Sequence, residues 1–171
     1  MIYLKEININ DAEKEYEAIT NILPDENGFM NEYYNSSKTE FVRDIIPTLI
    51  DHSKGINLRK DYVPDTQFFL WDDEKIVGLF RIRHYLNDTL KVGAGHIGYT
   101  ILEKYRGRGY ATIGLNLAIE KCEEIIKEKE IYLRVKKNNP ASLKVQVKCG
   151  AIIVNEDDEY FYTRIKLKKG D

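Results

Sequence analysis

The sequence has 171 residues, 43% of them hydrophobic and 11% aromatic, so the chain is long enough to close one sizeable core. Its 26 basic and 28 acidic residues leave a formal net charge of −2, which gives no general reason to expect nucleic acid or an anionic membrane as a partner. No run of about eighteen apolar residues occurs, and the N-terminus lacks a basic region followed by an apolar signal core. We therefore expect a cytoplasmic protein with a single domain over residues 1–171.

The first third of the chain predicts one strand and two helices. Residues 2–7 alternate weakly between apolar and polar and favour an opening strand. A helix is expected over residues 11–23, with Asp11 as its N-cap and Pro24 as its stop. A second helix is expected over residues 39–52, beginning at Thr39 and kinked or split by Pro47.

The middle of the chain predicts an antiparallel meander. Two runs rich in β-forming residues, 67–71 and 76–83, are separated by the polar turn 72–75, which is typical of a hairpin. A third run, 96–102, follows and leads into a glycine-rich loop.

That loop, residues 106–111, reads Arg-Gly-Arg-Gly-Tyr-Ala and precedes an amphipathic helix expected over 111–127. A strand, a glycine-rich turn and a helix in this order form an anion cradle, because the first N–H groups of a helix have no partner within it. Gly107 and Gly109 allow a positive φ and a close approach of the backbone to a ligand, so the ligand is expected to carry phosphates. The nucleoside-triphosphatase pattern and the dinucleotide pattern both fail here, the second because Thr112 replaces the third glycine.

The last part of the chain predicts a strand, a short helix and a closing hairpin. The strand spans 131–135, and the helix runs from Pro140 to Lys148 with Asn139 as N-cap. Gly150 is expected to supply the left-handed residue after the helix, and strands 151–154 and 160–167 complete an α+β arrangement. Cys122 and Cys149 are expected to be buried thiols, so neither a disulfide nor a metal site is expected.

Two motifs carry a resemblance to a known family. Arg106, Gly109 and Ala111 fit the pattern [Q/R]xxGx[G/A], and Asn139, Ser142 and Gly150 follow at the expected separation. In these features the sequence resembles the GCN5-related N-acetyltransferases over about residues 67–167. The resemblance implies a mixed, mostly antiparallel sheet of six to seven strands flanked by helices. The segments 83–87 and 95–99 resemble a bacterial subgroup of predicted acetyltransferases with unassigned substrates.

The resemblance also implies a site for acetyl-CoA. The pyrophosphate would lie on the loop amides, the pantetheine arm would pair with one strand edge, and the second motif would contact the arm or the adenosine side. The residues implied as cofactor contacts are Tyr99, Thr100, Ile101, Arg106, Gly107, Arg108, Gly109, Tyr110, Ala111, Thr112, Asn139 and Ser142. The acceptor pocket would be built by the first third of the chain, with contacts expected from Phe29, Tyr33, Tyr34 and His84, although general residue preferences favour core packing for the three aromatic residues.

The catalytic side chains cannot be carried over directly, because this sequence departs from the family at three positions. Gln146 stands where many members have a tyrosine that protonates the thiolate, and Arg134 and Gly95 stand at two positions that often hold a base. Histidine is the side chain whose ordinary pKa lies nearest neutrality, so His96 is the expected base. Tyr160 and Tyr162 on the last strand are the expected proton donors, and a structural role for all three stays open.

The expected function is transfer of an acetyl group from acetyl-CoA to a primary amine of a small molecule or peptide by direct attack. Two alternatives stay open: a non-catalytic acyl-CoA-binding or regulatory protein, favoured by the missing tyrosine and glutamate, and a binder of other phosphorylated ligands. The sequence does not identify the acceptor, and homodimer formation also stays open.

Overall fold

In a computed structural model of the protein, the structure is described for residues 1–169. Its strands form two main sheets, and every strand pair within them is antiparallel. The first sheet has the order β1-β4-β5-β6, with the strands β1 (Ile2–Glu6), β4 (Asp65–Asp72), β5 (Lys75–Arg83) and β6 (Ile97–Ile101). The second has the order β7-β9-β8, with the strands β7 (Glu130–Lys136), β8 (Ile152–Glu156) and β9 (Tyr160–Lys166). The expected mixed, mostly antiparallel α+β architecture is confirmed, with its strands divided four and three between two sheets.

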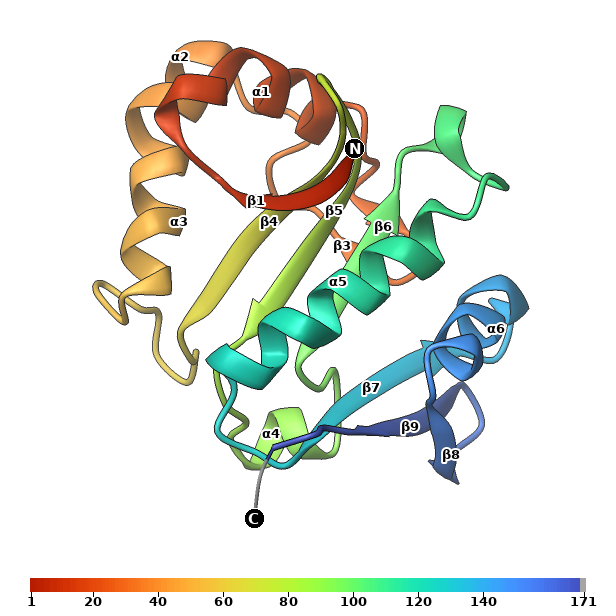
Figure 1. Ribbon diagram of the computed structural model, residues 1–171. Coiled ribbons are helices and arrows are strands. Elements are labelled where there is room, and N and C mark those ends of the chain that lie inside the picture. The colour runs from red at the N-terminus through yellow and green to blue at the C-terminus, as the bar shows by residue number, and fades with distance from the viewer. Residues whose placement is uncertain (170–171) are drawn as a thin grey trace.

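The two sheets meet at one point, where the start of β6 touches β7. The backbone N–H of His96 donates to the carbonyl of Tyr132 at 2.7 Å, and the Tyr132 N–H donates to Nδ1 of His96 at 2.9 Å. The strands share no ladder beyond this point, and Figure 1 shows β6 and β7 diverging from it. The divergence leaves one edge of β6 without a neighbouring strand.

Helices cover both faces of the first sheet (Figure 1). One face packs on three N-terminal helical segments, which are α1 (Ala12–Thr20), the π-helical turn η2 (Phe41–Ile45) and α3 (Ile46–Ser53). The short helix α2 (Lys38–Glu40) leads into η2 and has no buried residue. The other face packs on α5 (Tyr110–Ile125), which also contacts α6 (Pro140–Lys148). Successive side chains of β4 point to opposite faces of the sheet and so contribute to two hydrophobic cores. Phe68 and Leu70 belong to the core on the α5 side, and Phe69 and Trp71 belong to the core on the α1–α3 side.

Several short elements were not expected from the sequence. They are the hairpin β2 (Asp25–Glu26) and β3 (Phe29–Met30), the helix α4 (Asp88–Lys91), and the 3₁₀ turns η1 (Ile9–Asp11) and η3 (Glu103–Tyr105). The signal for α4 was present, because the Asn87 side chain accepts from the Leu90 N–H at 2.9 Å as an N-cap does. The hairpin turns through Asn27 and Gly28, both at positive φ, which is typical of a tight hairpin turn.

The expected boundaries of the two N-terminal helices were partly wrong. Helix α1 ends at Thr20 rather than Leu23, and the residue whose side chain caps the preceding turn is Asn8, not Asp11. Ser37, rather than Thr39, caps the second helical segment, because its hydroxyl accepts from the Glu40 N–H at 3.1 Å.

Pro47 lies in the first turn of α3, directly after the π-helical turn η2. The wider π-turn changes the backbone bonding before the proline, so the helical path continues through Pro47 without a break.

The C-terminal half follows the expected order of elements. Helix α5 starts one residue before the expected Ala111, and the Asn139 side chain caps α6 by accepting from the Ser142 N–H at 3.2 Å. Gly150 follows α6 with φ +95°, as a left-handed residue after a helix does. Cys122 is buried and Cys149 half-buried, and both are free thiols. None of the helices within residues 1–169 is long and apolar enough to cross a membrane.

Candidate active site

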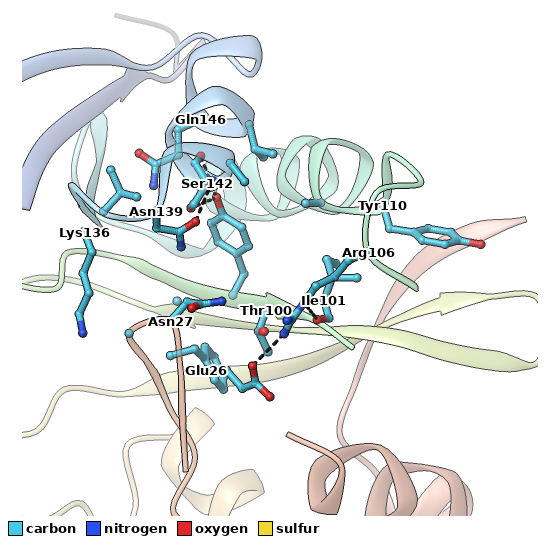
Figure 2. Close-up of a pocket in the computed structure, with 18 of the residues that line it drawn as sticks. Glu26, Asn27, Thr100, Ile101, Arg106, Tyr110, Lys136, Asn139, Ser142 and Gln146 are labelled. Carbon is cyan, nitrogen blue, oxygen red and sulfur yellow. Dashed lines mark hydrogen bonds and ion pairs between the residues drawn. The ribbon is translucent and has the colours of Figure 1, made fainter. Parts of the chain in front are cut away.

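A cavity of about 370 Å³ lies between the diverging strands β6 and β7, with the N-termini of α5 and α6 at its wall (Figure 2). The hairpin β2–β3 closes another side through residues 26–29. Every residue expected to contact the cofactor lines this cavity except Arg108. The structure therefore brings the strand edge and the loop that follows it together with the second motif, which comes after α5 and β7 in the sequence.

The glycine-rich loop presents free backbone N–H groups to the cavity. Gly107 and Gly109 have φ +74° and +83°, and no atom lies within 4 Å of the Cβ position at either residue. Ile113 donates to the Gly109 carbonyl at 3.2 Å as the first backbone bond of α5. The N–H groups of residues 109–112 therefore have no helical partner, and the positive end of the helix dipole faces the same space.

Arg106 does not point freely into this space. Its Nε donates to the Ile101 carbonyl at 3.0 Å, and its Nη2 pairs with Oε2 of Glu26 on β2 at 2.8 Å. The guanidinium is thus fixed at the mouth of the loop by two partners (Figure 2). Tyr110 contributes backbone alone, because its hydroxyl donates to Asp72 Oδ2 at 2.6 Å and the ring points away from the cavity (Figure 2).

The free edge of β6 follows from the pairing on its other side. Leu102 donates to the Val77 carbonyl, and the His96 carbonyl accepts from Arg83, so the even-numbered residues of β6 bond to β5. The backbone N–H and C=O groups of Tyr99 and Ile101 consequently point toward the open edge, where the Ile101 carbonyl already accepts Arg106. An extended, amide-bearing chain can pair with this edge as an added strand does.

A network of hydroxyl groups connects β6 to α6. The ring of Tyr99 stacks on Phe80 with centroids 5.3 Å apart, and its hydroxyl lies 2.8 Å from Ser142 Oγ (Figure 2). Burial raises the pKa of Tyr99, and hydrogen bonds to Ser142 and Gln146 oppose that shift. Gln146 is itself buried and accepts from the Thr163 hydroxyl at 2.7 Å. The Tyr99 hydroxyl is therefore neutral and held at the cavity wall.

His96 lies outside the cavity lining and is fully buried. Its Nδ1 accepts the Tyr132 N–H, so Nε2 carries the proton and donates to Glu128 Oε2 at 3.0 Å. Burial lowers the pKa of His96, with Glu128 as an opposing influence. Nδ1 is occupied by Tyr132 at the strand junction and Nε2 by Glu128, which favours a structural role over that of a base.

The two tyrosines on β9 differ in position. Tyr160 lines the cavity, and the Arg134 guanidinium stacks over its ring at 4.2 Å from the centroid. Tyr162 is outside the lining, and its hydroxyl donates to Asp157 Oδ2 at 2.6 Å in the β8–β9 turn. Of the two expected proton donors, only Tyr160 therefore faces the cavity.

The residues expected to contact the acceptor are also separated. Phe29 lines the cavity, where its ring lies 3.8 Å from the Cβ position of Gly98. Tyr33 packs into the core on the α1–α3 side, and Tyr34 is absent from the lining. His84 Nε2 lies 2.7 Å from the Thr66 hydroxyl at the far end of β5.

The structure explains why no base projects from the position of Gly95. Its φ is +69°, and a Cβ there would overlap the carbonyl of Tyr132. A residue with a side chain cannot occupy this position while β7 approaches so closely. In the sequence, the signal for this close approach was Gly95 itself, directly before His96. The His96 ring accepts the Tyr132 N–H in place of a backbone carbonyl.

Comparisons with known proteins agree with this architecture. The family profile described as Acetyltransferase (GNAT) family matches residues 29–151, which is well over half of the chain. The chain belongs to this family. No curated protein matches the sequence.

Solved structures of GNAT acetyltransferases share the fold at low sequence identity. A ribosomal-protein-S5-alanine acetyltransferase from Vibrio fischeri has a TM-score of 0.70 at 16% identity, with 98% of this chain and 93% of that chain covered. A microcin C7 self-immunity acetyltransferase, MccE, in complex with acetyl-CoA and AMP has a TM-score of 0.67 at 17% identity, with 97% and 92% covered. A chimera of the spermidine N-acetyltransferase SpeG from Vibrio cholerae and hSSAT has a TM-score of 0.62 at 18% identity, with 96% and 95% covered.

Proposed function

We propose that this protein transfers the acetyl group of acetyl-CoA to a primary amine of a small molecule or peptide by direct attack. The observation that carries the proposal is one continuous cavity, in which free loop amides at one end meet the open edge of β6 along the side. These two features suit a ligand with a pyrophosphate followed by an amide-bearing arm. Family membership supports acetyl transfer, and two neighbouring structures are complexes with CoA or acetyl-CoA.

The residues proposed for the cofactor suit its chemistry. The amides of residues 109–112 would hold phosphate oxygens, and the open space at the Cβ positions of Gly107 and Gly109 leaves room for that contact. The backbone groups of Tyr99 and Ile101 would pair with the pantetheine amides. Asn139 and Ser142 are fixed by the cap of α6 and line the opposite wall.

The reaction needs little from side chains. The neutral amine nitrogen attacks the thioester carbonyl, the C–N bond forms, the C–S bond breaks, and the amine proton passes to water or a base. The thiolate then takes a proton. Positioning and backbone donors carry much of such a reaction, and a general acid or base typically contributes about 10²–10⁴-fold.

Tyr99 is the proposed donor of that proton. Its side chain is half-buried and its hydroxyl lies in the cavity wall beside Ser142, on the strand proposed to hold the pantetheine arm. Many members of the family have a proton-donating tyrosine at the α6 position that Gln146 occupies here. In this protein, Tyr99 of β6 would take over that role. Tyr160 is the second proposed donor, because it also faces the cavity.

A second candidate function is binding of acyl-CoA without turnover. It is favoured by the side chains at the three family positions, since Gln146 bonds to Thr163, Arg134 stacks on Tyr160 and Gly95 has no side chain. Rapid acetylation of any one amine excludes this function.

The first experiment is calorimetric titration of the purified protein with acetyl-CoA, CoA, ATP and NAD. We expect micromolar binding of both CoA forms, with ATP and NAD much weaker. A release assay for the free CoA thiol across an amine panel then separates turnover from binding alone. If neither CoA form binds to the folded protein, the proposed function is refuted.

A further inference from the structure

Three arginine side chains gather on the face of the sheets that also carries Phe29. Arg81 and Arg83 are two positions apart on β5 and so lie on the same face, and Arg81 stands opposite Gly98 in the β5–β6 ladder. Gly98 and Arg134 both line the cavity, Arg134 from β7. Arg134 thus lines the cavity itself, while Arg81 and Arg83 lie outside the lining, next to Gly98 and to the junction of the two sheets.

Within residues 1–169, Asp65 is the one carboxylate that lies within 4 Å of a nitrogen of these three guanidinium groups. Asp65 Oδ2 lies 3.8 Å from Arg81 Nε, with side chains only 17% and 32% exposed. Burial lowers the pKa of Arg83 to about 10, and the positive charges of Arg81 and Arg134 contribute to that shift, while Asp65 opposes it. Other acidic residues of this region are already paired, Glu32 with Arg59 and Glu26 with Arg106.

Most hydrogen-bond donors of the three guanidinium groups have no partner within residues 1–169. Each carries five N–H groups, yet among residues 1–169 the three make one hydrogen bond, from Arg83 Nη1 to the Gly95 carbonyl at 3.0 Å. The Nε of Arg81 is buried and has no hydrogen-bond partner within the described chain. This Nε is the Arg81 atom that lies 3.8 Å from Asp65, so the N–H groups at the other two nitrogens of Arg81 are the donors left for an anion.

We propose that Arg81, Arg83 and Arg134 form a subsite for an anionic group on the acceptor, a carboxylate or a phosphate. This inference rests on the proposed function and names its acceptor class: an amine that also carries a negative charge. Planar guanidinium groups bind both anions through paired N–H donors. A polyamine is disfavoured, because its further positive charges would approach the same arginines.

The stacking of Arg134 on Tyr160 is compatible with this role. Stacking uses the face of the guanidinium and leaves the N–H groups at its edge available. Asp65 would hold Arg81 in place while the anion takes its remaining donors.

The test compares amines that differ only in the anionic group. Acetylation of γ-aminobutyrate is measured against n-butylamine, and phosphoethanolamine against ethanolamine, with spermidine as the polycation. We expect kcat/KM to be at least about tenfold higher for the anionic member of one pair, and that pair distinguishes carboxylate from phosphate. Arg81→Gln should reduce this ratio by about tenfold. Arg43→Gln, whose exposed guanidinium pairs with Asp44 at 2.7 Å, is the control and should keep the ratio.

A second measurement does not need turnover. Succinate and inorganic phosphate are titrated calorimetrically into the parent and the Arg81→Gln protein, each saturated with CoA where CoA binds. Binding of one anion that weakens about tenfold in Arg81→Gln supports the subsite. The subsite is overturned if the neutral amines are acetylated as well as their anionic counterparts, or if spermidine is preferred. It is also overturned if the parent binds neither anion, or if Arg81→Gln binds the anion as tightly as the parent. If the protein does not bind acetyl-CoA, the proposed function is refuted instead. The anion titration without CoA then still tests whether the arginines form an anion site.

Discussion

His96 exchanges two hydrogen bonds with Tyr132, giving its backbone N–H to the Tyr132 carbonyl at 2.7 Å and accepting the Tyr132 N–H at Nδ1 at 2.9 Å. The imidazole takes the place of a backbone carbonyl in this bridge. It joins the two sheets at one residue and lets β6 and β7 separate directly after it. The cavity exists because this bridge is short.

Gly95→Ala should destabilise the protein more than Gly107→Ala. Both glycines have positive φ, +69° and +74°, so alanine is strained by about 1–2 kcal/mol at either position. At Gly95 the new Cβ would also overlap the Tyr132 carbonyl, whereas at Gly107 nothing lies within 4 Å. Urea unfolding should show a loss at Gly95 that exceeds the loss at Gly107 by about 1 kcal/mol or more. Equal losses would contradict the described approach of β7.

His96→Gln tests whether His96 is a base or a support of the junction. Because the ring is buried and both nitrogens are bonded, we expect a loss of about 1–3 kcal/mol in unfolding free energy. The shape of the pH profile of kcat/KM should remain that of the parent. Disappearance of the acidic limb of that profile in a folded variant would instead assign the base to His96.

Gly109→Glu should abolish acetyl-CoA binding, because a carboxylate would occupy the space in front of the loop amides. Gly109→Ala separates strain from charge, since its φ of +83° is equally unfavourable for alanine but the space around its Cβ is open. We expect calorimetry to show a far larger loss of affinity for the glutamate variant. Unchanged acetyl-CoA affinity in folded Gly109→Glu would refute the proposed pyrophosphate position.

Tyr99→Phe should lower kcat by about tenfold or more and leave acetyl-CoA affinity nearly unchanged. The ring stack on Phe80 is kept, and only the hydroxyl beside Ser142 is lost. Tyr162→Phe is the matched control, because its hydroxyl bonds to Asp157 outside the cavity. Steady-state kinetics in which both variants behave alike would remove Tyr99 as the proton donor.

Glu15→Gln should flatten the pH dependence of stability. Glu15 is fully buried, accepts the Asn8 N–H at 3.1 Å, and burial raises its pKa from 4.5 to about 8. Between these values the folded state holds a proton that the unfolded state loses, so stability falls as the pH rises, by up to about 1.4 kcal/mol per pH unit.

Chemical unfolding at pH 5, 6 and 7.5 should therefore show a decline in the parent that the Gln variant lacks. The exposed Glu13, paired with Lys38 at 2.7 Å, is the control, and Glu13→Gln should keep the decline of the parent. A decline that persists in Glu15→Gln would assign it to other groups.

Elements with strong local signals were predictable from the sequence. The cap of α6 by Asn139, the positive φ of Gly109 and the hairpin β4–β5 all follow from residue types at fixed spacing. The cofactor side of the site consists mostly of backbone, which motifs describe well, so nearly all of its expected residues line one cavity.

Features that depend on distant contacts were not predictable in the same way. The burial of Glu15 and the occupation of both His96 nitrogens arise from partners elsewhere in the chain. The π-turn before Pro47 was missed because sequence patterns assume regular helix geometry. The arginines of the proposed anion subsite come from two sheets, and only the junction brings them together.

The hairpin β2–β3 connects the N-terminal third of the chain to the glycine-rich loop through an ion pair. Glu26 pairs with Arg106 at 2.8 Å on one side of the cleft, and Asp25 lies 4.0 Å from Lys136 of β7 on the other. A pyrophosphate bound at the proposed position would therefore compete with Glu26 for the Arg106 guanidinium. Since Phe29 belongs to the same hairpin and lines the cavity, we expect cofactor binding and acceptor binding to be coupled, so that each ligand changes the affinity for the other by the same factor.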